Sequence, residues 1–295
     1  MKMAMQQEFK DEKIRLIHWR EQPNFGDYLS PYLVSKLSCL VVLSKKAALP
    51  WKNFLKCLIW YPWLIYEYAL PFQKNLLAVG SILNLGNSKS IIWGSGFMNY
   101  DDSFCRGKSY AIRGPLSERK IINMGGYKCG IYGDPALLLP IVYNPIIEKK
   151  HKIGIVPHWR ETNYFFTNFT DSYIVDVRTD KVELVVDKIL SCEKILATSL
   201  HGLIVAHAYG IPALWIKHAD TNTDGFKFDD YFLSVGIKPY KGFSELEEII
   251  NFESYADWLF DNNKDVTLPQ CSVKEIQRKL LATAPFPLKK QYEHQ

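Results

Sequence analysis

The sequence predicts an α/β protein made of two Rossmann-like domains that face a central cleft. The chain has 295 residues, enough for two domains of roughly 100–150 residues each. Short, continuous apolar runs recur along both halves, as expected for parallel strands that are buried on both faces. Helix signals separate these runs, so each half shows the alternation of strand and helix that is typical of a doubly wound sheet.

The first domain is expected over residues 1–145. Its apolar runs predict strands at residues 14–19, 76–79, 91–93 and from 131 onward. Asp27 can cap a helix that extends to Leu37. A Gly-Pro pair at 114–115 opens a second helix, and a glycine pair at 125–126 ends it.

The second domain is expected over residues 146–280, because the stretch from Pro140 to Lys152 has the prolines and charges of a linker. Its predicted elements are strands at 153–157, 173–177, 194–199 and 212–216, and helices at 180–191, at 200–209 and within 244–281. Residues 281–295 form a polar tail that we expect to be loose.

The composition, 47% hydrophobic and 23% charged, excludes a disordered chain. A net charge of +5 suits small anions or an anionic membrane surface, and we expect no nucleic-acid partner. The six cysteines include no C-x-x-C pair, so we expect a reducing cytoplasm, with neither zinc nor disulfides. No secretory signal is recognisable. The adjacent acids at 101–102 and 229–230 are typical of solvated turns, so we expect no essential metal.

The strongest local signal is a buried strand that leads through Ser199, Leu200, His201 and Gly202 directly into a helix. The free amides and the positive dipole at a helix start make an anion site. A bound anion would raise the pKa of His201 and favour its imidazolium form, which is a general acid. The alternative is that His201 caps the helix or packs in the core. His207 lies off the His201 face of the same helix and is expected to be structural.

This segment, with the following Ala206, Ala208, Gly210 and Pro212, resembles the signature of polysaccharide pyruvyltransferases. That signature usually has an arginine before the Leu-His pair, where this chain has Ser199. Three further segments resemble motifs of the same family in the same order: Asn24-Phe25-Gly26-Asp27, Tyr132-Gly133-Asp134-Pro135-Ala136 and Gly225-Phe226-Lys227-Phe228-Asp229-Asp230-Tyr231. The resemblance therefore extends from about Trp19 to Gly236.

The resemblance implies a fold like that of the two-domain, GT-B-like glycosyltransferases, with phosphoenolpyruvate as co-substrate and no other cofactor. The enzyme would transfer the pyruvyl group of phosphoenolpyruvate to two hydroxyls of a sugar, in a polysaccharide or its lipid-linked precursor, as a cyclic ketal. Ser199, Leu200 and Gly202 would help to bind the donor in the second domain, and Asn24, Gly26 and Lys227 would bind the acceptor.

The residues of the N-terminal loop fit such roles on physical grounds. Gly26 lets the backbone approach a ligand closely, and Asp27 can accept the proton of a sugar hydroxyl. Capping of the following helix alone is the alternative for Asp27. Arg113 immediately precedes a helix start, where it can bind a phosphate, and a surface ion pair is its alternative.

His158, Trp159 and Arg160 follow the first strand of the second domain, so we expect them in the cleft beside the His201 loop. The planar guanidinium of Arg160 can bind the carboxylate or phosphate of the donor bidentately. The alternative is that Arg160 stacks on Trp159. His158 is expected to line the same donor site.

The segment 45–74 interleaves lysines with aromatic residues, which is typical of membrane-interfacial segments. The lysines are Lys45, Lys46, Lys52, Lys56 and Lys74, and the aromatic residues include Trp51, Trp60, Tyr61, Trp63, Tyr66 and Tyr68. Core helices or a dimer contact are the alternative. With a membrane contact, the enzyme would be peripheral on the cytoplasmic face of the cell membrane.

Two other functions remain open from the sequence. Two facing α/β domains also suit a glycosyltransferase that uses a nucleotide sugar, because fold alone does not determine function. A sugar-binding protein without catalytic activity is the alternative from another class. Stabilisation by phosphoenolpyruvate, and not by nucleotide sugars, would distinguish the pyruvyltransferase from both.

Overall fold

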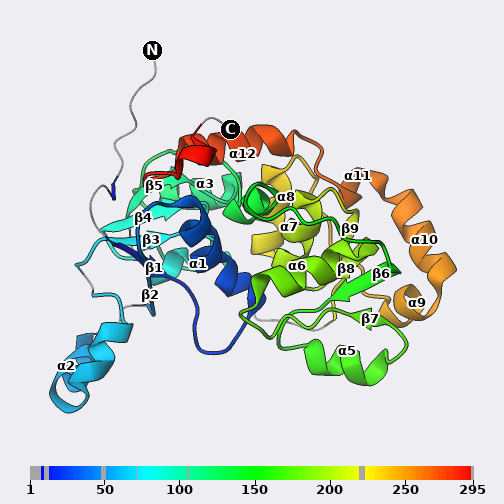
Figure 1. The fold of residues 1–295 in the computed structure, drawn as a ribbon, viewed down its shortest axis with the longest axis horizontal. Coiled ribbons are helices and arrows are strands. Elements are labelled where there is room, and N and C mark those ends of the chain that lie inside the picture. Colours follow the sequence, from blue (N-terminus) through cyan, green and yellow to red (C-terminus); the bar gives the residue numbers. More distant parts are fainter. Residues whose placement is uncertain are drawn as a thin grey trace.

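The structure is a computed structural model that describes residues 8–9, 13–47, 51–70, 72–104, 106–218 and 223–293, apart from seven side chains between 51 and 65. It contains two parallel β-sheets, one in each half of the chain, with helices around and between them (Figure 1). This arrangement confirms the α/β class and the presence of two parallel sheets.

The first sheet has five parallel strands in the order β2-β1-β3-β4-β5. They are β1 (Ile14–Ile17), β2 (Val42–Lys45), β3 (Asn75–Leu77), β4 (Ser90–Trp93) and β5 (Lys108–Ala111). The apolar runs predicted β1, β3 and β4 correctly but missed the edge strands β2 and β5. These two strands contain fewer apolar residues and are partly exposed. The strand expected from residue 131 is wrong, because Tyr132 forms no more than an isolated bridge with Ile112.

The helical elements of the first half are α1 (Phe25–Leu37), α2 (Trp51–Trp60), α3 (Pro115–Asn123) and α4 (Leu139–Val142), with 3₁₀ turns η1 (Pro62–Glu67), η2 (Leu83–Leu85) and η3 (Pro135–Leu138). Asn24, rather than the expected Asp27, caps α1, since its side chain accepts a hydrogen bond from Gly26 N. Gly114 and Pro115 open α3 as predicted. Past its end, Gly125 adopts a φ of 80°, a conformation that favours glycine.

The second sheet has the order β7-β6-β8-β9, again with all strands parallel. Its strands are β6 (His151–Val156), β7 (Tyr173–Ile174), β8 (Cys192–Ala197) and β9 (Ala213–Trp215), each within one residue to three residues of the predicted bounds. The helices α5 (Thr162–Asn168), α6 (Val182–Leu190) and α7 (Leu200–Ala208) lie between them in sequence. Residues 143–150, where we expected the linker, contain neither helix nor strand.

The remaining helices are α8 (Phe226–Ser234), α9 (Leu246–Asn251), α10 (Glu253–Asn262), α11 (Lys264–Thr267) and α12 (Val273–Ala282), followed by the 3₁₀ turn η4 (Lys290–Tyr292). Figure 1 shows that α12 and the C-terminal residues return to the first sheet. Phe286 is buried against Trp93 of β4, with ring centroids 5.3 Å apart. The expectation of a loose tail after residue 280 is therefore wrong, because apolar side chains within the polar stretch are buried on the first half.

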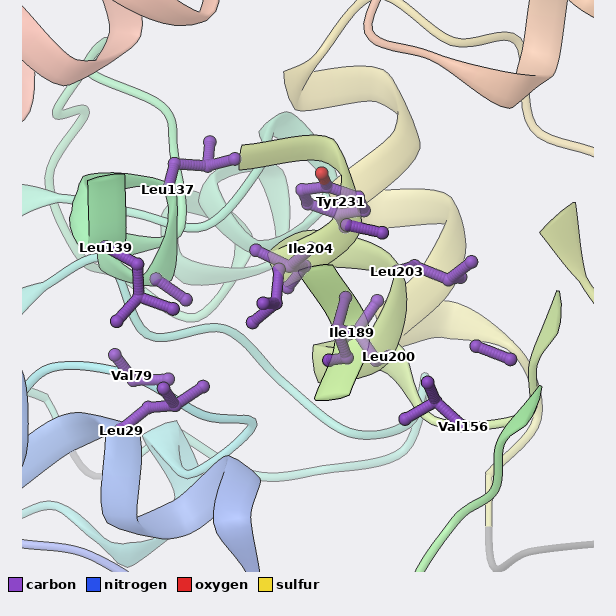
Figure 2. Close-up of a cluster of buried hydrophobic side chains, with 14 of the residues drawn as sticks. Leu29, Val79, Leu137, Leu139, Val156, Ile189, Leu200, Leu203, Ile204 and Tyr231 are labelled. Atoms are coloured by element: carbon purple, nitrogen blue, oxygen red, sulfur yellow. The ribbon is translucent and has the colours of Figure 1, made fainter. Parts of the chain in front are cut away.

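One apolar core runs between the two sheets (Figure 2). Leu29 of α1, Val79 after β3 and Leu139 of α4 contribute from the first half. Leu203 and Ile204 of α7 contribute from the second half. Seven of the nine residues of α7 are buried, so this short helix has apolar neighbours on nearly all sides and its position is tightly constrained.

We predict that Phe286→Ala lowers the free energy of unfolding by about 3–5 kcal/mol, the usual cost of emptying a buried aromatic site. Denaturant unfolding of the whole chain measures this cost. Phe252→Ala is the matched control, because Phe252 is 61% exposed, and should change stability by no more than about 0.5 kcal/mol. Equal effects of the two substitutions would show that the C-terminal residues do not pack as described.

Candidate active site

A cavity of about 310 Å³ opens between the two halves at the carboxyl ends of strands from both sheets. The first half lines it with Trp19, Asn24, Asp27, Ser81, Ile82, Asn84, Leu85, Met98, Asn99 and Asp102. The second half lines it with His158, Trp159, Arg160, Ser199, Leu200, His201 and Lys227. The structure therefore brings most of the predicted site residues into one space.

His201 lies in the first turn of α7 and contacts the N-terminal loop of the other half. Ser199 caps α7, accepting a hydrogen bond from Gly202 N at 3.4 Å. His201 Nδ1 lies so close to Gly26 that a Cβ atom at position 26 would be 2.2 Å from it. His201 Nε2 is buried and has no hydrogen-bond partner among the described residues. His158 Nδ1 in the same cavity lining likewise has no hydrogen-bond partner among the described residues.

The imidazolium form of His201 was expected with an anion bound beside it, and it stays a prediction for the ligand-bound protein. Burial, together with the nearby cations Lys227 and Arg113, lowers the pKa of His201 to about 3. The pKa of His158 is also lowered to about 3, first by burial and then by Lys227 and Arg160. Both imidazoles are therefore neutral at physiological pH.

Asn24 and Asp27 form a hydrogen-bonded pair at the start of α1. Asn24 Nδ2 donates to Asp27 Oδ2 at 2.6 Å. The backbone of the same loop is fixed to the second half, because Phe25 N donates to Val177 O at 2.8 Å. Burial raises the pKa of Asp27 to about 7, although the Asn24 hydrogen bond and the charge of Lys227 act in the opposite direction. Asp27 can therefore exchange a proton near neutral pH.

Lys227 enters the cavity from the first turn of α8. The residue is 5% exposed, and among the described residues its ammonium group has no hydrogen bond or ion pair. Burial lowers its pKa to about 8, with a further contribution from Arg113. Lys227 is thus a buried cation in the cavity lining, within reach of an anionic ligand, and its expected role in acceptor binding stays a prediction.

Arg160 lines the cavity and stacks on Trp159, as the alternative for it expected, and its role in binding the donor stays a prediction. Its guanidinium lies over the Trp159 ring, 5.0 Å from the centroid. It is exposed and makes no hydrogen bond or ion pair with a described residue. Stacking on one face of the guanidinium leaves its N–H groups available for a carboxylate or a phosphate.

Arg113 does not line the cavity, which corrects the expectation that it binds phosphate directly. Its side chain is fully buried and pairs with Asp230 of α8, with Nε and Oδ2 3.1 Å apart. It also donates to Ser81 Oγ at 2.5 Å and to Phe97 O at 2.6 Å. Asp230 in turn accepts hydrogen bonds from Ser117 N and Oγ. Arg113 therefore joins α8 to the first half, behind the cavity wall.

Several residues of the first-half wall escaped sequence reasoning. Ser81, Asn84, Asn99 and Asp102 lie in the loops that follow β3 and β4. Their position after predicted strands was the available signal, but these loops carry no recognisable motif. Among the described residues, no group of three or more His, Cys, Asp or Glu side chains is arranged to bind a metal.

We predict that Gly26→Ala changes the free energy of unfolding in opposite directions depending on whether His201 is present. Gly26→Ala should destabilise the parent by about 1–3 kcal/mol, the usual cost of overpacking. In a His201→Ala background the same change should stabilise by up to about 1 kcal/mol, because alanine favours a helix over glycine. A double-mutant cycle of unfolding free energies measures the coupling. The same sign in both backgrounds would contradict the contact.

Comparisons with known proteins identify the family to which the chain belongs. The chain is 30% identical over 190 residues to an uncharacterized protein of Acanthamoeba polyphaga mimivirus, and the alignment spans 58% of this chain and 63% of that protein. No solved structure matches. The sequence profile of polysaccharide pyruvyl transferases matches residues 4–220. By this match over most of its length, the chain belongs to the polysaccharide pyruvyl transferase family.

Proposed function

We propose that this protein transfers the pyruvyl group of phosphoenolpyruvate to two hydroxyls of one sugar in a polysaccharide or its lipid-linked precursor, forming a ketal and releasing phosphate. Family membership supports pyruvyl transfer to a polysaccharide. The observation that supports the donor is the presence of two cations in the cavity lining beside His201, Lys227 and Arg160, neither of which has an ion pair with a described residue. A donor with one phosphate and one carboxylate matches two cations at the amino end of a helix.

In this proposal Lys227 supplies the buried charge that binds the donor, since Ser199 stands where an arginine is usual and its hydroxyl caps α7. Arg160 binds the second anionic group at the cavity mouth. As in GT-B-like enzymes, each half would bind one substrate, with residues 1–145 binding the acceptor and residues 146–280 binding the donor. The ion pair of Asp230 on α8 with Arg113 of the first half supports this role of Lys227, because it holds the first turn of α8 at the cavity.

The protonation states of the free protein suggest how the two catalytic residues divide the proton transfers. Asp27, with its raised pKa, gives a proton to the methylene carbon of phosphoenolpyruvate, and the central carbon becomes electrophilic. Neutral His201 takes the proton of the first sugar hydroxyl as that oxygen bonds to the central carbon. This assignment exchanges the acid and base roles that the sequence suggested for the two residues.

The second half of the reaction restores both residues. Protonated His201 gives its proton to the bridging oxygen as the bond between the central carbon and the phosphate breaks. Asp27 takes the proton of the second hydroxyl as that oxygen closes the ketal ring. One hydroxyl proton thus ends on the pyruvyl methyl group and the other on phosphate. The cations of the donor wall stabilise the anionic groups throughout.

We also propose that the protein binds the cytoplasmic face of a membrane through α2 and η1, which stand apart from the rest of the molecule in Figure 1. The side chains of Ile59, Trp60, Trp63 and Tyr66 are each more than 60% exposed. The lysines contribute less than the sequence suggested. Lys46 pairs with Glu67, Lys74 pairs with Glu8, and Lys45 donates to Tyr66 O. The Lys52 side chain lies outside the described residues. No described helix is long and apolar enough to span a membrane.

We predict that phosphoenolpyruvate raises the melting temperature of the protein and that nucleotide sugars do not. Pyruvyl transfer to a panel of hexosides, read by mass spectrometry, should fall by about 10²–10⁴-fold in His201→Ala. That variant should still be stabilised by phosphoenolpyruvate, whereas Lys227→Gln should lose this stabilisation. As pH rises through about 7, kcat/KM should fall, because Asp27 must be protonated to act as the acid.

His151→Ala is the control for these variants, because His151 lies outside the cavity and stacks on Tyr173. It should keep the parent's donor stabilisation and turnover. Stabilisation by a nucleotide sugar, with no response to phosphoenolpyruvate, would favour a glycosyltransferase. Near-parental turnover in a folded His201→Ala variant would remove His201 from the mechanism.

For the membrane contact, we predict that the protein co-sediments with vesicles of phosphatidylglycerol and phosphatidylcholine, and that binding survives high salt in large part because the aromatic rings carry it. The double substitution Trp60→Ser and Trp63→Ser should abolish binding. Trp258→Ser on α10 is the control, since Trp258 is 54% exposed but belongs to another surface. If the parent does not bind vesicles but forms a dimer, and the double substitution makes it monomeric, the segment is a subunit contact.

A further inference from the structure

The two walls of the active-site cavity differ in charge. The second-half wall carries the cations Lys227 and Arg160 and no carboxylate. The first-half wall carries no lysine or arginine, and its negative charge comes from Asp102, because Asp27 is protonated when it acts as the acid of the proposed reaction. Arg113 lies behind the first-half wall, where Asp230 neutralises its charge. An anionic ligand is therefore attracted to one wall and repelled by the other.

The Asp102 carboxylate is held in place by the backbone. Its Oδ2 atom accepts hydrogen bonds from Met98 N at 2.8 Å and from Asn99 N at 3.0 Å. Both donors belong to the loop after β4, and the same loop is tied to the second half because Asp224 N donates to Asn99 Oδ1 at 3.1 Å. The negative charge of Asp102 is thus a fixed feature of the cavity rather than a mobile side chain at its rim.

The rest of the first-half wall suits a neutral, polyhydroxylated ligand. Trp19 is 40% exposed and offers an aromatic face, against which the apolar C–H face of a sugar ring can pack. Ser81 and Asn84 add a hydroxyl and an amide to the same wall. A few oriented polar groups around an apolar surface are what a pocket for an uncharged sugar requires.

We propose that this wall binds the terminal sugar of the acceptor and selects one that is uncharged. The ring packs on Trp19, two of its hydroxyls face Asp27 and His201, and Asp102 excludes a ring that bears a carboxylate. The proposal rests on the pyruvyl transfer proposed above. Because the cavity of about 310 Å³ must also hold the donor, no more than one ring of the acceptor enters it, and the remaining glycan lies outside.

The test compares matched acceptors, p-nitrophenyl galactoside with galacturonide and glucoside with glucuronide, at saturating phosphoenolpyruvate. The parent should prefer the neutral member of a pair by about tenfold or more in kcat/KM, because like charges in a binding site are strongly disfavoured. Asp102→Asn should lower this preference at least severalfold. Asp101→Asn, which changes an exposed neighbour outside the cavity lining, should leave the preference at its parental value.

A second pair of variants tests the aromatic face without changing any charge. Trp19→Ala should raise KM for the neutral acceptor with little change in KM for phosphoenolpyruvate, and Trp19→Phe should restore much of the loss. Equal transfer to both members of a pair by the parent, or equal effects of Asp102→Asn and Asp101→Asn, would overturn this inference and leave the proposed function intact. Transfer to no sugar, with no stabilisation by phosphoenolpyruvate, would overturn both.

Discussion

The buried ion pair between Arg113 and Asp230 joins the two halves directly behind the cavity. Its two side chains come from opposite halves, and neither is exposed to solvent. Removing one partner of such a pair leaves an uncompensated buried charge, which typically costs about 3–5 kcal/mol. Because Asp230 follows Lys227 by three residues on α8, the pair also fixes the cation that faces the donor. The cationic wall of the cavity therefore depends on a contact that no substrate touches.

The apolar pattern of the sequence predicted the strands that consist of continuous apolar runs and missed both edge strands of the first sheet. All four strands of the second sheet were predicted, including its edge strands β7 and β9, because each lies in such a run. The edge strand β5 begins with the exposed Lys108 and gave no such run. The packing of Phe286 on Trp93 could not be predicted from the sequence either, because the two residues are far apart in the chain and Phe286 lies in a stretch that is polar on average.

The candidate site shows the same limit at the level of single residues. The rule that ligands bind at the carboxyl ends of parallel strands located the loops around Asp27, His158 and His201 correctly. This rule does not predict the protonation states of the residues that it locates. A helix start with a bound anion favours a charged His201, but in the free chain burial and two neighbouring cations lower the pKa of His201. The direction of such a balance depends on contacts between halves, which local sequence does not encode.

The return of the C-terminal residues to the first sheet imposes an order of events during synthesis on the ribosome. The first half emerges early, yet Lys289 N donates to Leu37 O and Trp93 Nε1 donates to Leu280 O. Until α12 and the residues up to Lys289 leave the exit tunnel, the nascent first half exposes the apolar surface around Trp93. Chaperones that bind exposed apolar segments would have this surface as a target, and the docking of α12 and Phe286 would then displace them.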